Sequence, residues 1–78
     1  MIHVRLFASL RELAGAAVLE VDAADVGGLL DQLSSKLGSE FDRIMAAGSA
    51  VVDGERAPRD RRLKDGDEVA LLPPVSGG

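Results

Sequence analysis

The feature of this chain that most constrains its fold is one long helical pattern enclosed between groups of short alternating segments. Residues 2–6 alternate apolar with polar side chains and predict a half-buried strand. Residues 17–21 predict a second strand, antiparallel to the first. Asp25 is placed to cap the helix that follows. The apolar side chains of that helix keep helical spacing: Val26, Leu29, Leu30, Leu33 and Leu37.

Two shorter helical patterns lie on either side of the main helix. The apolar residues between 10 and 13 predict a helical turn that begins after Ser9, with Glu12 completing a capping-box pattern. Gly38 is placed to end the main helix in a left-handed conformation. Residues 41–45 then predict a further short helical turn.

The C-terminal part of the chain returns to short strands. Residues 49–52 predict a third strand, and Asp53-Gly54 is a strong signal for a tight hairpin. Residues 56–62 predict a short edge strand, because Pro58 lacks the N–H that a central strand needs. Residues 68–72 predict the last strand, which the following prolines end.

This order of elements predicts an α+β fold of the β-grasp (ubiquitin-like) class. We expect a mixed sheet of four to five strands with one main helix packed on one face, and the first and last strands parallel at its centre. A chain of 78 residues buries only a little over about 60% of its unfolded surface. We therefore expect one β-grasp domain over residues 1–72 and a flexible C-terminal diglycine tail over residues 73–78.

Composition excludes several classes of function. The chain contains no cysteine, so its side chains supply no disulfide, thiol nucleophile, zinc–thiolate site or iron–sulfur cluster. A net charge of −4 argues against a nucleic-acid partner. No apolar stretch approaches the roughly 18 residues of a membrane span, and the start lacks a signal-peptide pattern. We expect no membrane association and a cytoplasmic location.

The sequence ends in Pro73-Pro74-Val75-Ser76-Gly77-Gly78. Such a terminal glycine pair arises by chance in roughly 0.5% of chains. Because glycine has no Cβ, Gly77 and Gly78 can thread a narrow channel, and the Gly78 carboxylate is unhindered. The two prolines stiffen the base of the arm. This pattern indicates a terminus that is itself the reactive group; the alternative is an ordinary disordered tail or an expression remnant.

Together, several blocks make the chain resemble the ubiquitin-like sulfur-carrier family, most closely the small (sulfur-carrier) subunits of molybdopterin synthase. The resemblance covers the full length, and its terminal block is the most specific part. It rests on these segments: Val4, Phe7-Ala8, Arg11-Glu12-Leu13, Gly15, residues 63–70 and residues 73–78.

The resemblance implies a carrier cycle. An adenylating (E1-like) enzyme uses ATP to activate the Gly78 carboxylate, and a sulfurtransferase system converts the adenylate to a thiocarboxylate. The large catalytic subunit, in a heterotetramer, then takes the sulfur onto a pterin precursor of the molybdenum cofactor. Gly77 and Gly78 would be the reacting residues of this chain, which would bind no cofactor and would leave catalysis to the large subunit.

Phe7 and Leu72 are candidate partner contacts. By strand alternation Phe7 lies on the face away from the main helix, as do His3 and Arg5, and Leu72 points the same way. If the first and last strands are parallel neighbours, Phe7 and Leu72 lie side by side and anchor an interface. The alternative is a minor secondary core, and a slip of one residue in strand phase would reverse the assignment.

Arg11 and residues 73–75 complete the predicted contact set. Arg11 lies in the block shared with the family and is expected to meet an acidic partner surface; the alternative is a solvated helical turn with a local ion pair. Pro73, Pro74 and Val75 form the base of the arm that would enter a partner's pocket.

The remaining charged residues have plainer readings. His3 is expected to be a surface residue rather than a catalytic base. Asp65, Asp67 and Glu68 flank a turn at Gly66, so we expect no metal site. A basic cluster is expected to be a solvated edge strand, protected from mispairing by its charges. Its members are Arg56, Arg59, Arg61, Arg62 and Lys64.

Two other functions fit the same fold and tail. One is sulfur carriage for another pathway, such as thiamine thiazole, a modified tRNA base or an amino acid. The other is a ubiquitin-like modifier whose Gly78 forms an isopeptide bond with a lysine.

Overall fold

The computed structural model describes residues 1–74, so the predictions for Val75, Gly77 and Gly78 lie outside the described part. Five strands form one sheet: β1 (Ile2–Leu6), β2 (Val18–Val21), β3 (Ser49–Val52), β4 (Glu55–Arg56) and β5 (Glu68–Leu72). The helices of the described residues are α1 (Ala8–Ala14), α2 (Val26–Leu37) and α3 (Ser39–Met45). None of these helices is long and apolar enough to cross a membrane.

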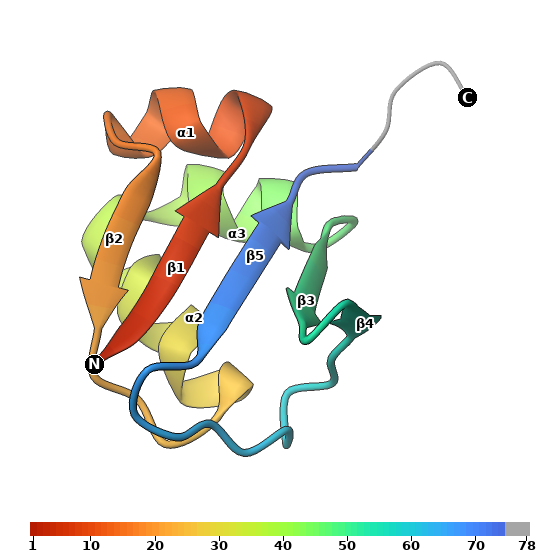
Figure 1. Cartoon of the computed structure of the whole chain (residues 1–78). Coiled ribbons are helices and arrows are strands. Elements are labelled where there is room, and N and C mark those ends of the chain that lie inside the picture. Colours follow the sequence, from red (N-terminus) through yellow and green to blue (C-terminus); the bar gives the residue numbers. More distant parts are fainter. Residues whose placement is uncertain (75–78) are drawn as a thin grey trace.

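The sheet confirms the predicted β-grasp topology. Its strand order is β2-β1-β5-β3-β4, with β5 at the centre. β1 and β5 are parallel, whereas β2, β3 and β4 join the sheet through antiparallel pairs. α2 and α3 lie behind one face, and α1 lies at the end of the sheet where β1 and β5 finish (Figure 1). No helix of residues 1–74 covers the opposite face of the sheet, which we call the open face (Figure 1).

The core confirms the predicted strand phase. Alternate residues of β1 and β5 are buried, while the residues between them are exposed or half-buried. The most deeply buried large side chains come from the sheet and from each of the three helices: Val4, Leu10, Val26, Leu29, Leu33, Phe41, Val52, Val69 and Leu71. One apolar layer between sheet and helices therefore holds the fold together.

The start of α2 is formed as predicted, and its end differs in one detail. The Asp25 side chain accepts a hydrogen bond of 2.7 Å from the backbone N–H of Gly28, so Asp25 is the N-cap. Gly38 has the expected positive φ of 84°, but its ψ of −165° lies outside the left-handed helical region. The reason is that α3 begins at Ser39, so Gly38 must turn the chain directly into a second helix.

The predicted capping box in α1 is wrong. The helix begins at Ala8, one residue before Ser9, and its N-cap is Phe7, with no side-chain cap hydrogen bond. The Phe7 carbonyl accepts hydrogen bonds from the backbone N–H groups of Leu10 (3.0 Å) and Arg11 (3.4 Å). The chain turns from strand to helix through Ala8, whose φ is 49°.

The predicted edge strand over residues 56–62 is mostly wrong. β4 lies at the edge of the sheet but contains only Glu55–Arg56. The hairpin before it is confirmed, with positive φ at both Asp53 and Gly54. After β4 the chain leaves the sheet and crosses to the N-terminus of α2. There the carbonyls of Arg61 and Arg59 accept hydrogen bonds from α2 amides, at 3.0 and 2.8 Å. Free helix N–H groups thus draw this segment away from the sheet.

Candidate functional site

The candidate site is the open face of the sheet where β1 and β5 end together. Leu6 of β1 is paired with Leu71 of β5, and both are buried. Phe7, which directly follows β1 in an extended conformation, and Leu72, the last residue of β5, point to the open face instead. Their side chains are 40% and 36% exposed, although both are large and apolar. Continued by one residue, the parallel register brings Phe7 next to Leu72, and their role as partner contacts stays a prediction.

Val18 adds to this apolar surface and was not singled out from the sequence. It is 46% exposed and is paired with Arg5 across β1 and β2, so its side chain shares the open face. This places Val18 diagonally from Phe7. The alternation of side chains in residues 17–21 is the sequence signal that could have identified Val18 as an outward-facing residue. We call the set Phe7, Val18 and Leu72 the tail-root patch.

The other end of the open face is charged. His3 Nδ1 lies 3.4 Å from Glu20 Oε1, and Arg5 Nε lies 3.2 Å from Glu68 Oε2. All four side chains are well exposed, so each pair contributes little to stability. His3 is a surface residue, as predicted, and it forms an exposed cross-strand pair with Glu20. The open face therefore changes from charged to apolar toward the base of the tail.

The base of the tail is held by β3. Leu72 is paired with Ser49, and Gly48 immediately precedes that pair. Pro73 is half-buried and Pro74 is exposed. Val75, Gly77 and Gly78, which the sequence assigns to the same arm, lie outside the described residues. The structure thus places the start of the arm beside the tail-root patch.

Arg11 lies at the same end of the molecule. It is an exposed residue of α1, the helix that follows Phe7 and lies across the ends of β1 and β2 (Figure 1). An Arg side chain there can reach a partner docked against the tail-root patch. The predicted contact with an acidic surface stays a prediction.

The basic cluster is largely solvated, as predicted, but only Arg56 lies in the edge strand β4. Three of its members bind other parts of the domain: Arg59 donates to Asp31 Oδ1 at 2.8 Å, Arg61 to Asp53 Oδ2 at 3.1 Å, and Arg56 to Ser49 Oγ at 2.7 Å. The hydrogen bond to Asp31 raises the pKa of Arg59. These arginines join the segment after β4 to the sheet and to α2, but the paired side chains are largely exposed, so each contact contributes little to stability.

The acidic turn also has a structural role. The Asp65 carboxylate pairs with the N-terminal ammonium of Met1. This contact raises the pKa of the terminal amine and lowers the pKa of Asp65. Asp67 accepts a hydrogen bond of 2.9 Å from the backbone N–H of Lys64, which closes the turn. Within residues 1–74 no group of three His, Asp or Glu side chains could hold a metal ion.

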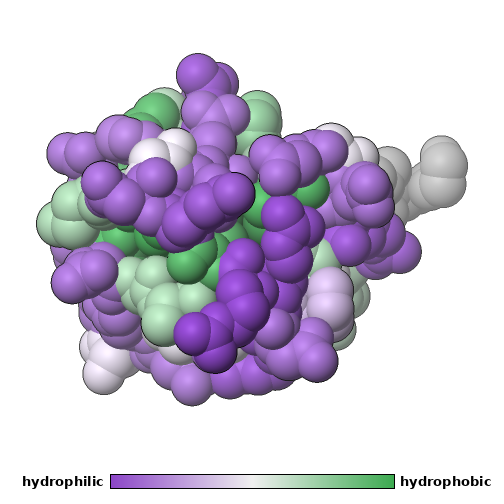
Figure 2. Space-filling view, turned by 60° about the horizontal axis from the view of Figure 1, so that its bottom comes forward, coloured by the Kyte–Doolittle hydropathy of each residue, from purple (hydrophilic) through white to green (hydrophobic). Residues whose placement is uncertain are grey.

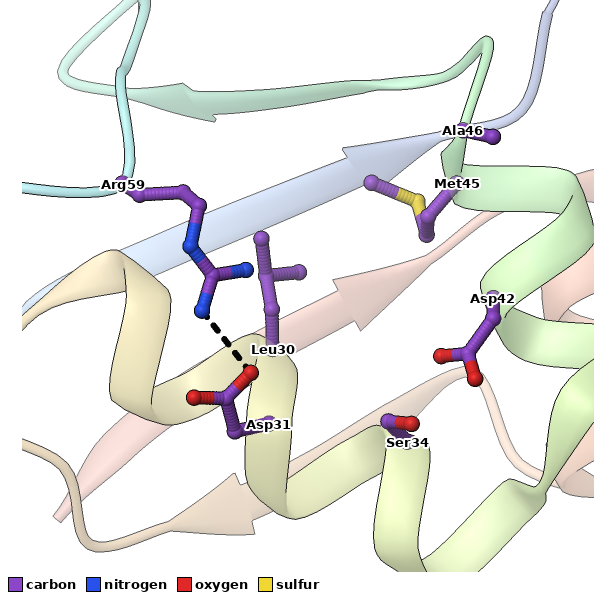
Figure 3. A pocket seen from close by; sticks show the side chains of 7 residues that line it. All are labelled: Leu30, Asp31, Ser34, Asp42, Met45, Ala46 and Arg59. Carbon is purple, nitrogen blue, oxygen red and sulfur yellow. Dashed lines mark hydrogen bonds and ion pairs between the residues drawn. The ribbon is translucent and has the colours of Figure 1, made fainter.

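A hollow of about 340 Å³ lies on the helical side, away from the tail-root patch. The Arg59–Asp31 ion pair lies at one side of it, and Met45 and Asp42 of α3 line the other (Figure 3). Its lining mixes charges of both signs with apolar atoms. The face seen in Figure 2 is mostly hydrophilic, with apolar side chains showing between the hydrophilic ones.

Comparison with known proteins agrees with this geometry over the whole length of the chain. The profile of the ThiS family matches residues 4–78. The molybdopterin synthase sulfur carrier subunit of Escherichia coli (strain K12) is 40% identical over 83 residues, covering 100% of both proteins. Small archaeal modifier protein 1 of Haloferax volcanii is 37% identical over 84 residues, covering 95% of this chain and 97% of that protein. A crystal structure of SAMP1 from the same organism matches with a TM-score of 0.84 at 34% identity, covering 99% of this chain and 98% of that one.

Proposed function

This chain belongs to the ThiS family, and on that basis we propose that it is the sulfur-carrier subunit of a molybdopterin synthase. The observation that carries the proposal is the 40% identity to the E. coli sulfur carrier subunit over the whole of both proteins. The family match extends to residue 78, so it includes the diglycine. The chain contains no cysteine, and sulfur carried by it must therefore sit on the terminus.

In the proposed cycle Gly78 supplies the reacting carboxylate. One carboxylate oxygen attacks the α-phosphorus of ATP on an adenylating enzyme, and pyrophosphate leaves. A sulfide equivalent from a sulfurtransferase then attacks the acyl carbon, AMP leaves, and a thiocarboxylate remains. Activation must come first, because an unactivated carboxylate offers only a poor leaving group. After sulfur is passed to a pterin precursor, water restores the carboxylate. We place this cycle in the cytoplasm.

The partner in the last step is the large subunit of the synthase, in a heterotetramer. The tail-root patch supports this assignment, because exposed apolar side chains gathered beside a reactive arm are the form of an interface anchor. Phe7, Leu72 and Arg11 would contact the partner's surface, and Pro73, Pro74 and Val75 would lead Gly77 and Gly78 into its active site. The catalytic groups belong to the partners, and the carrier acts as a substrate.

Intact-mass measurement tests the proposal. The purified chain with ATP, magnesium and sulfide should stay unchanged. Adding an adenylating enzyme of a molybdopterin pathway should release pyrophosphate and replace one oxygen by sulfur, with the change confined to Gly78. The chain lacking Gly78 should keep its fold and show no change in mass. Sulfur incorporation into that shortened chain away from its new C-terminus would disprove terminal chemistry.

A second candidate function is protein modification. The 37% identity to small archaeal modifier protein 1, and the TM-score of 0.84 to its structure, favour it specifically. A modifier would be recovered from cells attached through Gly78 to lysines of other proteins. A carrier would be recovered with its large subunit and would transfer sulfur to a pterin precursor. Sulfur transfer to a thiazole or a tRNA base instead would assign the carrier to another pathway.

A further inference from the structure

We infer that Gly48 is a positioning residue for the carrier reaction, because it sets the point at which the tail leaves the domain. The inference rests on the proposed function, in which the tail must reach an active site on another protein. A Cβ built on Gly48 would lie 2.6 Å from the carbonyl oxygen of Leu72 and 3.3 Å from that of Ile44. These two are backbone atoms and cannot turn aside, whereas the third neighbour, the Met45 sulfur at 3.2 Å, is the end of a flexible side chain.

Position 48 requires glycine because another part of the backbone lies close to it, and not because its own backbone conformation requires glycine. Among residues 1–74 the glycines with positive φ are Gly15, Gly38, Gly54 and Gly66, and Gly48 does not belong to this group. An L-residue could therefore adopt the Gly48 backbone, and only the approach of Leu72 forbids a side chain. By contrast, a Cβ on Gly54 would meet nothing within 4 Å. The two glycines flank β3, one at each end.

The chain reaches this close approach through a short turn. α3 ends at Met45, and the Gly48 N–H donates a hydrogen bond of 3.1 Å to the Met45 carbonyl. Ser49 then pairs with Leu72, the last residue of β5. Gly48 is thus wedged between the C-terminus of α3 and the end of the central strand.

The Leu72 carbonyl transmits any displacement to the tail. Its oxygen and the Pro73 nitrogen belong to one planar peptide unit, so moving the oxygen turns the bond from which the tail departs. Pro73 cannot absorb that rotation freely, since its ring holds φ near −65°, and Pro74 follows with the same restriction. A misplacement of about 1 Å at reacting atoms can cost about 100-fold in rate. An added methyl group at Gly48 would therefore redirect the arm.

Steady-state adenylation kinetics test this inference. The carrier is the varied substrate of an adenylating enzyme of a molybdopterin pathway, with ATP, and pyrophosphate release is measured. Gly48→Ala should lower kcat by at least about 10-fold and change KM by less than about 3-fold, because the domain still docks while the carboxylate is misplaced. Gly54→Ala is the matched control: it strains a positive-φ turn without touching the tail, and its kcat should stay within about 2-fold of wild type.

The double variant Pro73→Gly/Pro74→Gly removes the stiff connection and keeps the Gly48 contact intact. Its kcat should also fall about 10-fold or more, and adding Gly48→Ala to it should cause no further loss. If Gly48→Ala does not fold, the proline variant alone decides, and a kcat within about 2-fold of wild type would overturn the inference. A folded Gly48→Ala with normal kcat would overturn it as well. Failure of the wild-type chain to be adenylated would instead disprove the proposed function.

Discussion

Ala8 lies between Phe7 of the tail-root patch and the first turn of α1, and its φ of 49° is in the left-handed region. Side chains with a Cβ pay about 1–2 kcal/mol there, and glycine does not. We predict that Ala8→Gly raises the free energy of unfolding by about 1 kcal/mol, measured by urea denaturation. Ala8→Val should lower it, because a β-branched side chain fits this region worst. A less stable Ala8→Gly would mean that the turn is not strained.

Predictions for single residues succeeded where the alternation of apolar and polar side chains along a strand determines which face a residue lies on. Strand alternation placed Phe7 and Leu72 on the open face and their neighbours in the core. It did not identify Gly48, because the oxygen that excludes a side chain there belongs to Leu72, which is adjacent in the sheet but far away in the sequence. The capping-box pattern misplaced the start of α1, since the strand-to-helix turn runs through Ala8, a residue type that seldom adopts positive φ.

At the scale of elements, the contact between α2 and the segment after β4 explains why Gly27 occurs in a helix, where glycine is disfavoured. The Gly27 N–H donates to the Arg59 carbonyl at 2.8 Å, and a Cβ on Gly27 would lie 3.2 Å from the same oxygen. Alanine usually stabilises a helix interior by about 1 kcal/mol over glycine. Here we predict the opposite sign: Gly27→Ala should lower the free energy of unfolding by about 1 kcal/mol, because the oxygen cannot withdraw without losing its hydrogen bond.

Ser35→Ala is the control for this prediction. Ser35 is an exposed residue of the same helix, so its substitution should follow propensity and be neutral or slightly stabilising. Thermal or urea unfolding of both variants gives the comparison. A higher free energy of unfolding in Gly27→Ala would show that the segment carrying Arg59 moves aside at little cost in free energy.

The same contact explains why the predicted edge strand failed. Charges and Pro58 in residues 56–62 match an edge strand locally, and the hairpin at Asp53-Gly54 was predicted correctly. The first amides of a helix need acceptors, however, and this segment supplies two of them to α2. Sequence periodicity reports which face of an element is apolar, but not which distant backbone groups will satisfy a helix end.

At the scale of the whole molecule, the chain start is fastened to the turn before β5, and this predicts a pH dependence. The pKa of the terminal amine is raised from 8.0. Its contribution to the free energy of unfolding is therefore complete below pH 8 and is lost as pH rises through the raised value. Asp65 has its pKa lowered from 3.8, so its contribution is present above that pH and is lost as pH falls through the lowered value. Both groups are exposed, and the effect is small and screened by salt.

Asp65→Asn should therefore be less stable than wild type between about pH 4 and pH 8, with the difference shrinking on both sides of that window. Urea denaturation across pH at low salt measures it. A difference that persists unchanged at high pH would show that the side chain acts through the turn and not through the amine.

The proposed function assigns stability to one face of the sheet and partner binding to the other, and Leu71 and Leu72 test that division most directly. They are neighbours on β5, of identical chemistry, yet Leu71 is fully buried and Leu72 is 36% exposed. Leu71→Ala should cost about 2–5 kcal/mol of folding free energy, because it leaves a cavity in the apolar layer. Leu72→Ala should cost little stability and should weaken binding to the large subunit by about 1–3 kcal/mol, and Phe7→Ala should do the same.

Measuring the affinity for the large subunit by calorimetry and the thermal stability of the free chain separates the two effects. Unchanged affinity with a large loss of stability in Phe7→Ala or Leu72→Ala would place the tail-root patch in a second core, and partner docking would then have to use another surface.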